Sequence, residues 1–195
     1  MTVLEEDRIN MADHGDDLDS WFERLERMPV PEGYRVEIVE GAVHMTPQRN
    51  VHWQIIRRIL HALEARFGMD VVVLSDVRID FPGHLNGFSP DLAKVRDGAG
   101  EDAHGRWRYQ DIEFVAEVIS KGTAANDYGS KKLTYATAGV PVYMIADPYT
   151  GKCHVYTDPK KGDYRTELSV AFGVEIDLTG TVVDLVLPTD AFPRD

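Results

Sequence analysis

Two acidic residues, Asp91 and Glu117, combine a suitable side-chain type with a setting that indicates chemistry. Asp91 follows Pro90 and precedes a short apolar run, and Glu117 lies inside the strongly apolar segment 111–120. An ionised carboxylate in a buried strand is costly unless a cation pairs with it. Carboxylates are also the ligands that Mg²⁺ takes from proteins, with its other positions left to water and phosphate. If adjacent strands bring the two acids together, they predict a magnesium site; the alternative is that each forms a salt bridge or caps a helix.

Lys131 is the basic residue best placed to join this pair. It lies near the start of a predicted helix over 126–139, four residues after Asp127 and four before Tyr135, so these three share one helix face. A lysine aimed at the carboxylates would orient a water molecule and offset charge that develops on a phosphate. The alternative is a solvated Asp127–Lys131 ion pair worth under about 1 kcal/mol. Lys132 is turned by ~100° on the helix, so we expect it to point to solvent or to a DNA backbone.

The elements that must position these residues can be read from the apolar pattern. Apolar residues on both faces of 111–120 are typical of a strand that is covered on both sides. The segment 140–147 is a second apolar strand, and the helix 126–139 lies between the two. This order predicts a parallel crossover, hence an α/β sheet with helices on its faces. Other predicted elements are helices over 18–28 and 50–68, strands over 34–45 around a Glu40-Gly41 turn, a strand over 70–81 and a loop over 81–91.

Composition describes a globular chain without membrane or disulfide features. The 195 residues are 43% hydrophobic and 28% charged, and Cys153 is the single cysteine. We find no apolar run near the ~20 residues of a membrane span and no signal peptide, so we expect a cytoplasmic protein without membrane contact. Residues 1–17 are predicted to form an acidic, flexible segment, and residues 18–195 a single domain. The net charge of −12 argues against broad electrostatic attraction to nucleic acid.

The order of short motifs over residues 34–157 resembles the Uma-type restriction endonuclease family, which is placed within the PD-(D/E)XK nuclease superfamily. The matching stretches are "VEIVEG", "TPQRNVHWQI", "SPD", "EVIS" and "DYGSKKLTYATAGVPVYMIADP". No one of these motifs is specific, whereas the ordered series is. The resemblance implies an α/β fold of the restriction-endonuclease type, with a mixed central sheet flanked by helices and additional antiparallel strands.

The resemblance also implies roles for the residues that match. Asp91 and Glu117 stand where the superfamily has its two metal-binding acids, and the backbone carbonyl of Val118 would be a further ligand by analogy. The superfamily lysine usually lies two residues after the second acid, where this chain has Ile119. Lys131 on the following helix is the candidate replacement. The implied catalytic set is therefore Asp91, Glu117 and Lys131.

Five more residues are accessory candidates: Glu37, His52, Asp127, Lys132 and Tyr135. Glu37 is either a further acid near the metal or a strand residue that pairs with Arg35 or Arg57. His52 either supports the site and shuttles protons or hydrogen-bonds locally at the start of its helix. For Tyr135 we expect packing against the sheet rather than a chemical role.

These features together predict a nuclease that uses Mg²⁺ (or Mn²⁺) to hydrolyse phosphodiester bonds, with DNA as the expected substrate. The metal would polarise the phosphate and lower the pKa of a bound water. A homodimer would suit cleavage of both strands. The alternative is an inactive nuclease-fold protein that acts as a binding or assembly module, which the acidic net charge favours. A local basic strip would let the chain bind phosphates despite that charge; its members are Lys94, Arg96, Lys121, Lys131 and Lys132.

Overall fold

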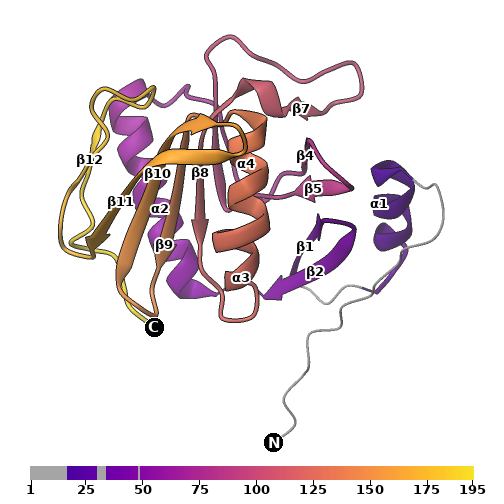
Figure 1. The fold of residues 1–195 in the computed structure, drawn as a ribbon, viewed down its shortest axis with the longest axis horizontal. Helices are drawn as coiled ribbons and strands as arrows, with labels where there is room; N and C mark the ends of the chain where they lie inside the picture. Colours follow the sequence, from indigo (N-terminus) through magenta and orange to yellow (C-terminus); the bar gives the residue numbers. More distant parts are fainter. Residues whose placement is uncertain (1–16, 30–33, 48) are drawn as a thin grey trace, which may run out of the picture.

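A six-stranded mixed sheet forms the centre of the molecule in the computed structural model, which describes residues 17–29, 34–47 and 49–195 (Figure 1). The strand order is β11-β10-β9-β8-β6-β3, with β8 and β9 parallel and the other neighbours antiparallel. The strands are β3 (Val73–Leu74), β6 (Leu92–Val95), β8 (Ile112–Val118), β9 (Val142–Asp147), β10 (Lys152–Lys160) and β11 (Asp163–Ala171). The predicted crossover from β8 through a helix to β9 is therefore confirmed.

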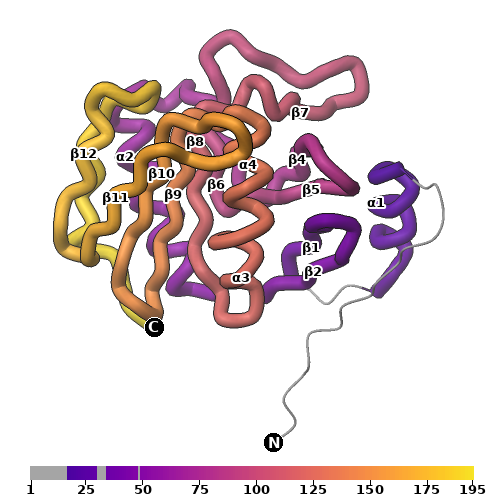
Figure 2. The backbone as a smooth tube through the Cα atoms, viewed as in Figure 1, coloured from indigo at the N-terminus to yellow at the C-terminus, as the bar shows by residue number. Residues whose placement is uncertain are grey.

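A second sheet of five short strands, in the order β2-β1-β5-β4-β7, packs beside the first. Its strands are β1 (Tyr34–Val39), β2 (Ala42–Pro47), β4 (Ile79–Phe81), β5 (Asn86–Phe88) and β7 (Trp107–Arg108). The turn between β1 and β2 is the predicted one, with positive φ at both Glu40 and Gly41. A further pair near the C-terminus consists of β12 (Ile176–Asp177) and β13 (Val186–Leu187). The long connection between β6 and β7 extends beyond the two sheets (Figure 2).

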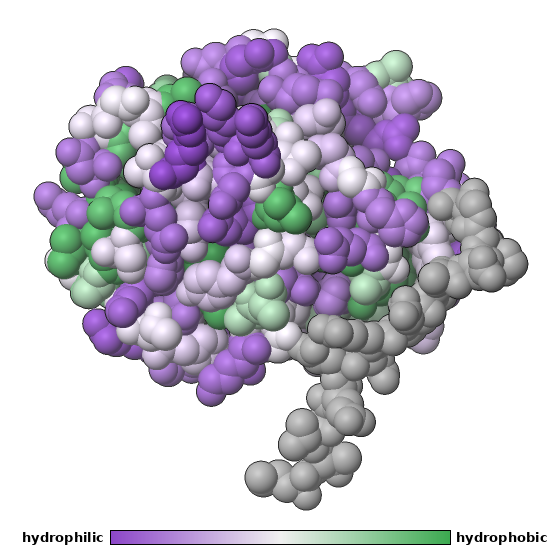
Figure 3. Space-filling model, in the orientation of Figure 1, coloured by the Kyte–Doolittle hydropathy of each residue, from purple (hydrophilic) through white to green (hydrophobic). Residues whose placement is uncertain are grey.

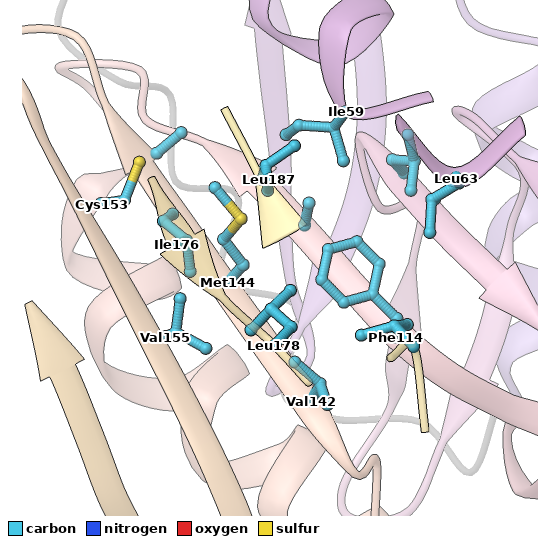
Figure 4. Close-up of a cluster of buried hydrophobic side chains, with 14 of the residues drawn as sticks. Ile59, Leu63, Phe114, Val142, Met144, Cys153, Val155, Ile176, Leu178 and Leu187 are labelled. Carbon is cyan, nitrogen blue, oxygen red and sulfur yellow. The ribbon is translucent and has the colours of Figure 1, made fainter. Parts of the chain in front are cut away.

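The helices cover both sheets: the first packs against the five-stranded sheet, and the longest and the last lie on opposite faces of the central sheet (Figure 1). They are α1 (Leu18–Glu26), α2 (Asn50–Phe67), α3 (Ala124–Asn126) and α4 (Lys132–Ala138), with a 3₁₀ turn at Tyr109–Asp111 and a π-helical turn at Asp127–Lys131. On one face, Ile59 and Leu63 of α2 pack against Phe114 of β8 and Met144 of β9, together with residues of the C-terminal segment (Figure 4). On the other face, α4 and the five-stranded sheet share a second apolar cluster with the central sheet.

Both faces of β8 are therefore buried, as its apolar pattern predicts. Phe114 and Val118 belong to the cluster under α2, whereas Val115 and Ile119 belong to the cluster under α4. Since side chains alternate along a strand, Glu117 lies on the α4 face. This placement directs the one carboxylate within the buried part of β8 towards the helix that carries the candidate lysine.

The α/β fold class is confirmed, and the structure changes several element boundaries. The segment 70–81 contains two short strands, β3 and β4, which belong to different sheets, and the predicted loop 81–91 contains β5. The helix predicted over 126–139 begins at Ala124 without a side-chain cap and passes through the π-helical turn before α4. The segment predicted to be flexible, 1–17, lies outside the described residues except for Asp17, whose side chain caps α1.

The predicted basic strip does not form, because two of its members are interior residues. Lys94 and Lys131 are each only 1% exposed. Lys94 follows Leu92 by two on β6 and lies over the Phe67 ring of α2, whereas Lys131 faces Glu117 on the opposite side of the sheet. The face of the molecule in Figure 3 is mostly hydrophilic, with apolar residues in small patches. Within the described residues, no helix is long and apolar enough to cross a bilayer.

Candidate active site

Asp91 and Glu117 lie side by side at the ends of neighbouring strands. In the antiparallel pairing of β6 with β8, Leu92 lies opposite Ala116, so the next pair outward is Asp91 and Glu117. The Asp91 N–H donates to Glu117 Oε2 at 3.3 Å, and the Val118 N–H donates to Asp91 Oδ2 at 2.6 Å. The two acidic residues are 4% and 1% exposed. The structure thus brings the predicted carboxylate pair together in the interior.

The helix α4 and the π-helical turn before it supply the groups that bond Glu117 from the other side. Lys131 Nζ lies 2.7 Å from Glu117 Oε1, and the Tyr135 hydroxyl donates to the same oxygen at 2.8 Å. Lys131 is 1% exposed and Tyr135 is completely buried. The helix face that carries both residues therefore meets the carboxylates, as their spacing predicts.

The π-helical turn places Asp127 and Lys131 in contact with each other and with a further acid. Lys131 Nζ lies 3.2 Å from Asp127 Oδ1 and 3.0 Å from Glu37 Oε1, which projects from β1. Single π turns inside helices are frequent at functional sites. An ammonium group has three N–H donors, and here three carboxylates surround it, those of Glu37, Glu117 and Asp127. In this arrangement Lys131 joins the acids to one another.

A second cation, Arg35, completes the group and is expected from sequence only as a partner for Glu37. Its Nη1 lies 2.6 Å from Asp91 Oδ1 and 3.9 Å from Glu117 Oε2, and its Nε lies 3.7 Å from Glu37 Oε2. The Arg35 side chain is 8% exposed. Arg35 and Glu37 are two positions apart on β1, so the period of a strand puts them on one face. That spacing is the signal that could have identified Arg35 as a site residue.

The buried group has more carboxylates than cations. Its acids are Glu37, Asp91, Glu117 and Asp127, and its bases are Arg35 and Lys131. Four acids against two bases leave a formal excess of two negative charges. Burial raises the pKa of Glu117 to about 8, against the attraction of Lys131 and reinforced by the neighbouring acids, and burial likewise raises the pKa of Asp127 to about 6. At neutral pH the group therefore either retains a proton or binds further positive charge.

Glu37 and Lys131 keep their charges in this group. Burial opposes ionisation of Glu37, but Lys131, Arg35 and the N–H of Ser89 outweigh it and lower the pKa of Glu37. Burial also opposes the charged form of Lys131, but the attraction of Glu117, Glu37 and Asp127 raises its pKa. These two residues therefore form an ion pair that stays charged. Of the four acids, Glu117 is the first to bind a proton as the pH falls.

His52, beside Asp91, and Ser120, three residues after Glu117 in the chain, each have a buried polar atom without a hydrogen-bond partner. His52 is 6% exposed, interacts electrostatically with Asp91 and hydrogen-bonds to the backbone of Ile119. Burial lowers the pKa of His52, so its imidazole is neutral near pH 7. Four buried side-chain polar atoms in the described part of the chain have no hydrogen-bond partner, and three of them are His52 Nε2, Ser120 Oγ and Arg35 Nε. Since such atoms are normally satisfied, these three are available to a ligand.

Comparison with known proteins places this site in a family. A family model described as "Putative restriction endonuclease", Uma2, matches residues 22–190. The chain belongs to the Uma2 family. The matched region contains every site residue described above, from Arg35 to Tyr135.

A solved structure supports the fold of this Uma2 chain. The crystal structure of a "putative nuclease" from Anabaena variabilis matches it with a TM-score of 0.66 and 15% sequence identity, over 91% of this chain and 97% of that chain. At this identity the likeness shows the fold alone. No curated protein matches the chain.

The accessory residues predicted for the Uma2 site divide into two groups. Glu37, His52, Asp127 and Tyr135 all lie at the carboxylate pair or in contact with Lys131. Lys132 points elsewhere: its Nζ lies 3.5 Å from Asp163 Oδ1 and 4.5 Å from the centre of the Tyr156 ring. Val118 contributes its N–H to Asp91, and its carbonyl as a metal ligand stays a prediction.

The Uma2 site fits one divalent cation held by two carboxylates. Asp91 Oδ1 and Glu117 Oε2 both face Nη1 of Arg35, so a positive group lies between them. Mg²⁺ is commonly held by one or two carboxylates, and the excess of two negative charges equals its charge. No group of three or more His, Cys, Asp or Glu side chains within the described ranges is arranged to hold a metal ion. Backbone, water and substrate would therefore supply the other ligands.

Proposed function

We propose that this Uma2 protein is a nuclease that uses Mg²⁺ or Mn²⁺ to hydrolyse phosphodiester bonds, with DNA as its substrate. Asp91 and Glu117 hold the metal, with the Val118 carbonyl as a further ligand. The observation that supports this most strongly is the adjacent, buried carboxylate pair inside a group with two excess negative charges. The family description, "Putative restriction endonuclease", agrees with it.

The bound metal supplies a Lewis acid for the scissile phosphate. The protein's own contribution begins with holding the two carboxylates in place. Asp91 is fixed by the Val118 N–H at 2.6 Å, and Glu117 by the Tyr135 hydroxyl at 2.8 Å. Because these bonds leave Asp91 Oδ1 and Glu117 Oε2 directed at one point, the ligand oxygens are arranged before the metal arrives.

Lys131 orients the attacking water and stabilises the charge that develops on the phosphate. Its ammonium is shared among three carboxylates in the arrangement described above. When Glu117 serves as a ligand, it competes less for the lysine, and one N–H donor becomes available to a water or a phosphate oxygen. Its partners Glu37 and Asp127 keep the ammonium at the site meanwhile.

His52 and Ser120 provide a place for the proton and for the substrate oxygens. The neutral imidazole of His52 carries an unpartnered Nε2 in the interior, beside Asp91. Such a nitrogen can accept a proton or a hydrogen bond from water, and the Ser120 hydroxyl can donate to a phosphate oxygen. Both residues thus act next to the carboxylates without holding the metal.

Cleavage of supercoiled plasmid DNA tests this function. The wild-type protein is incubated with Mg²⁺, with Mn²⁺ and with EDTA, beside Glu117→Gln and a matched control, Glu167→Gln, on the exposed face of β11. We expect nicked or linear product with either metal from the wild type and from Glu167→Gln, and none with EDTA or from Glu117→Gln.

Two further arms define the substrate. Single-stranded DNA and RNA of matched sequence are offered under the same conditions, and cleavage of RNA alone would replace DNA as the substrate. Equal cleavage by the wild type and Glu117→Gln, or cleavage in EDTA, would contradict the proposal. The homodimer stays a prediction, which the sedimentation of the purified protein can measure.

A further inference from the structure

Arg35 occupies the point at which the two proposed metal ligands converge. Its Nη1 is 2.6 Å from Asp91 Oδ1 and 3.9 Å from Glu117 Oε2. The other oxygens of these acids are already engaged, since Asp91 Oδ2 accepts the Val118 N–H and Glu117 Oε1 accepts from Tyr135 and lies 2.7 Å from Lys131. Glu117 Oε2 also accepts the Asp91 N–H, at 3.3 Å, but is left with a free lone pair, so the pair offers one oxygen each, and both oxygens face the guanidinium.

A metal ion held by this pair would have to take the place of that guanidinium. Mg²⁺ binds carboxylate oxygens at about 2.0–2.1 Å, so an ion held by Asp91 and Glu117 together would need the space beside Asp91 Oδ1 that Arg35 Nη1 occupies, 2.6 Å from that oxygen. Two positive groups cannot share that space, because a cation a few Å from another in the interior is strongly repelled. The position is thus used by either the metal or Arg35.

The side chain has a second position within reach. The same Nη1 lies 3.4 Å from Oδ1 of Asp76, whose side chain is 34% exposed and marks the outer edge of the group. The Arg35 Nε lies 3.7 Å from Glu37 Oε2 and has no hydrogen-bond partner. A rotation about the end of the Arg35 side chain would release Asp91 and retain Asp76, which already accepts from Nη1, while Glu37 remains close.

We propose that Arg35 is a built-in competitor for the metal position, and that it moves to the outer edge of the site when the metal binds. This inference rests on the proposed metal-dependent function. In the metal-free protein Arg35 neutralises Asp91 and Glu117 and keeps them together. Once released, its planar guanidinium presents paired N–H donors on the side of Asp76, the most exposed member of the group, where they fit the oxygens of a substrate phosphate.

The exchange has a measurable consequence for metal affinity. If Arg35 covers the ligands for about nine-tenths of the time, the apparent dissociation constant of the metal is raised about tenfold over its intrinsic value. Removing the guanidinium should therefore tighten metal binding, because Arg35 Nη1 lies 2.6 Å from Asp91 Oδ1 and occupies the position of the metal. A residue that merely supports the site would have the opposite effect, because its loss would loosen the ligands.

Titration calorimetry with Mn²⁺, in the absence of nucleic acid, tests this consequence. The variant is Arg35→Gln, and the matched control is Arg78→Gln, since Arg78 also pairs with two carboxylates, those of the partly buried Asp80 and the exposed Asp19, but does not touch the metal pair. We expect the Mn²⁺ dissociation constant to fall by about tenfold or more in Arg35→Gln and to stay within about twofold of wild type in Arg78→Gln.

Crystal structures of the wild-type protein, metal-free and with Mn²⁺, test the movement itself and do not depend on whether Arg35→Gln folds. We expect Mn²⁺ on Asp91 and Glu117, with Arg35 beyond hydrogen-bonding distance of Asp91. Mn²⁺ on both acids with Arg35 still bonded to Asp91, or no tighter binding by a folded Arg35→Gln, would overturn the competition and leave the metal-dependent function standing. Absence of Mn²⁺ binding in the wild type and in Arg35→Gln would overturn both.

Discussion

Two lysines are buried to the same extent on opposite faces of the central sheet, yet their surroundings differ in kind. Lys94 and Lys131 are each 1% exposed. Lys94 Nζ lies 2.6 Å from Glu113, donates to the Val95 carbonyl at 3.2 Å and lies 4.4 Å from the centre of the Phe67 ring. Lys131 differs because three buried carboxylates lie within 3.2 Å of its ammonium, so the acids around it outnumber the cation.

The partner of Lys94 is placed by an irregularity of the sheet. Between β6 and β8 the register passes from Lys94 opposite Phe114 to Val95 opposite Ile112, so Glu113 is an additional residue, as in a β-bulge. A bulge turns one side chain out of its regular direction, and here it gives the lysine one carboxylate. Glu113 is the close partner of Lys94, and a second acid, the solvent-exposed Asp97, lies 3.8 Å from its Nζ, which is the pattern of a structural ion pair near the surface.

Comparison of the two lysines indicates that burial of a charge is not by itself a sign of function. A buried group in which acids outnumber bases is such a sign. Around Lys94, the partly exposed Glu113 and the solvent-exposed Asp97 satisfy the cation. Around Lys131 and Arg35, four acids exceed two bases, and a folded protein retains such an excess only if protons or another cation complete it. Substitutions at the two sites should therefore differ in their effects on activity and on stability.

The largest contrast is expected between the two glutamates of β8. Glu117→Gln should reduce plasmid cleavage by about 10²-fold or more, because a charged contact at the reaction centre is lost, while the metal-free protein should be as stable as wild type or more stable. Glu113→Gln should leave cleavage per folded molecule unchanged and lower the free energy of unfolding, because Lys94 loses its main partner. Cleavage rates and urea unfolding in EDTA measure both effects; the reverse ranking would contradict the distinction.

The next contrast is between the lysines themselves. Lys131→Met leaves three buried acids without their shared cation, so we expect the free energy of unfolding at pH 8 to fall by about 3 kcal/mol. The cleavage rate should fall by orders of magnitude, whereas Mn²⁺ binding should be retained. Lys94→Met should lower the free energy of unfolding by only about 1 kcal/mol. Glu113 is 23% exposed and can be hydrated, and a methionine keeps the contact with Phe67. Denaturant titration of both variants gives the comparison. Equal losses of stability in Lys131→Met and Lys94→Met, with full activity in both, would contradict the proposed role of Lys131 in catalysis.

Metal binding should stabilise the folded protein through the Asp91–Glu117 pair and not through the Lys94–Glu113 pair. At a Mg²⁺ or Mn²⁺ concentration of about 100 times the dissociation constant, ligand linkage predicts a gain of about 2.7 kcal/mol in wild type. The same gain is expected in Lys94→Met and none in Glu117→Gln. Thermal unfolding with and without metal measures this, and an equal shift in Glu117→Gln would mean that the ion binds elsewhere.

The metal-free protein should lose stability as the pH rises through neutrality. The pKa of Glu117 is raised from 4.5 to about 8 by burial, so in this interval the folded state holds a proton that the unfolded chain has released. Stability from this proton is complete below pH 4.5 and disappears as the pH passes 8. We expect the urea midpoint in EDTA to fall from about pH 6.5 to about pH 8.5 in wild type and to stay level in Glu117→Gln. A midpoint that rises in wild type would show that Glu117 is ionised throughout.

The smallest effect is expected from Lys132, which follows Lys131 in the chain but pairs with Asp163 at 3.5 Å. Lys132→Ala should change stability by less than about 1 kcal/mol and leave the single-turnover rate near wild type. Any loss should be in DNA affinity, with a shallower dependence on salt. A larger loss of rate than in Lys131→Met would mean that the helix face meeting the carboxylates is assigned to the wrong lysine.

Much of the site could be predicted from local patterns. The alternation in β8 predicts a strand buried on both faces and hence an unusual carboxylate at Glu117. The four-residue spacing of Asp127, Lys131 and Tyr135 predicts a shared face, and the structure puts all three at the carboxylates. These predictions succeed because they depend only on helix and strand geometry and on the cost of burying charge.

Which acids and bases lie in contact depends on the tertiary packing and does not follow from local sequence patterns. The basic strip predicted from the sequence treats Lys94 and Lys131 alike. Packing buries them on opposite faces, Lys94 beside acids that are partly or fully exposed and Lys131 beside three buried acids. The position of Arg35 depends on the five-stranded sheet, which brings residue 35 to residue 91 across 56 positions of the chain. Periodicity within a strand gives the face of a side chain and says nothing about which distant segment lies opposite. The sequence by itself therefore determined the candidate ligands and the lysine, and the packing of the two sheets determined that a guanidinium lies between those ligands.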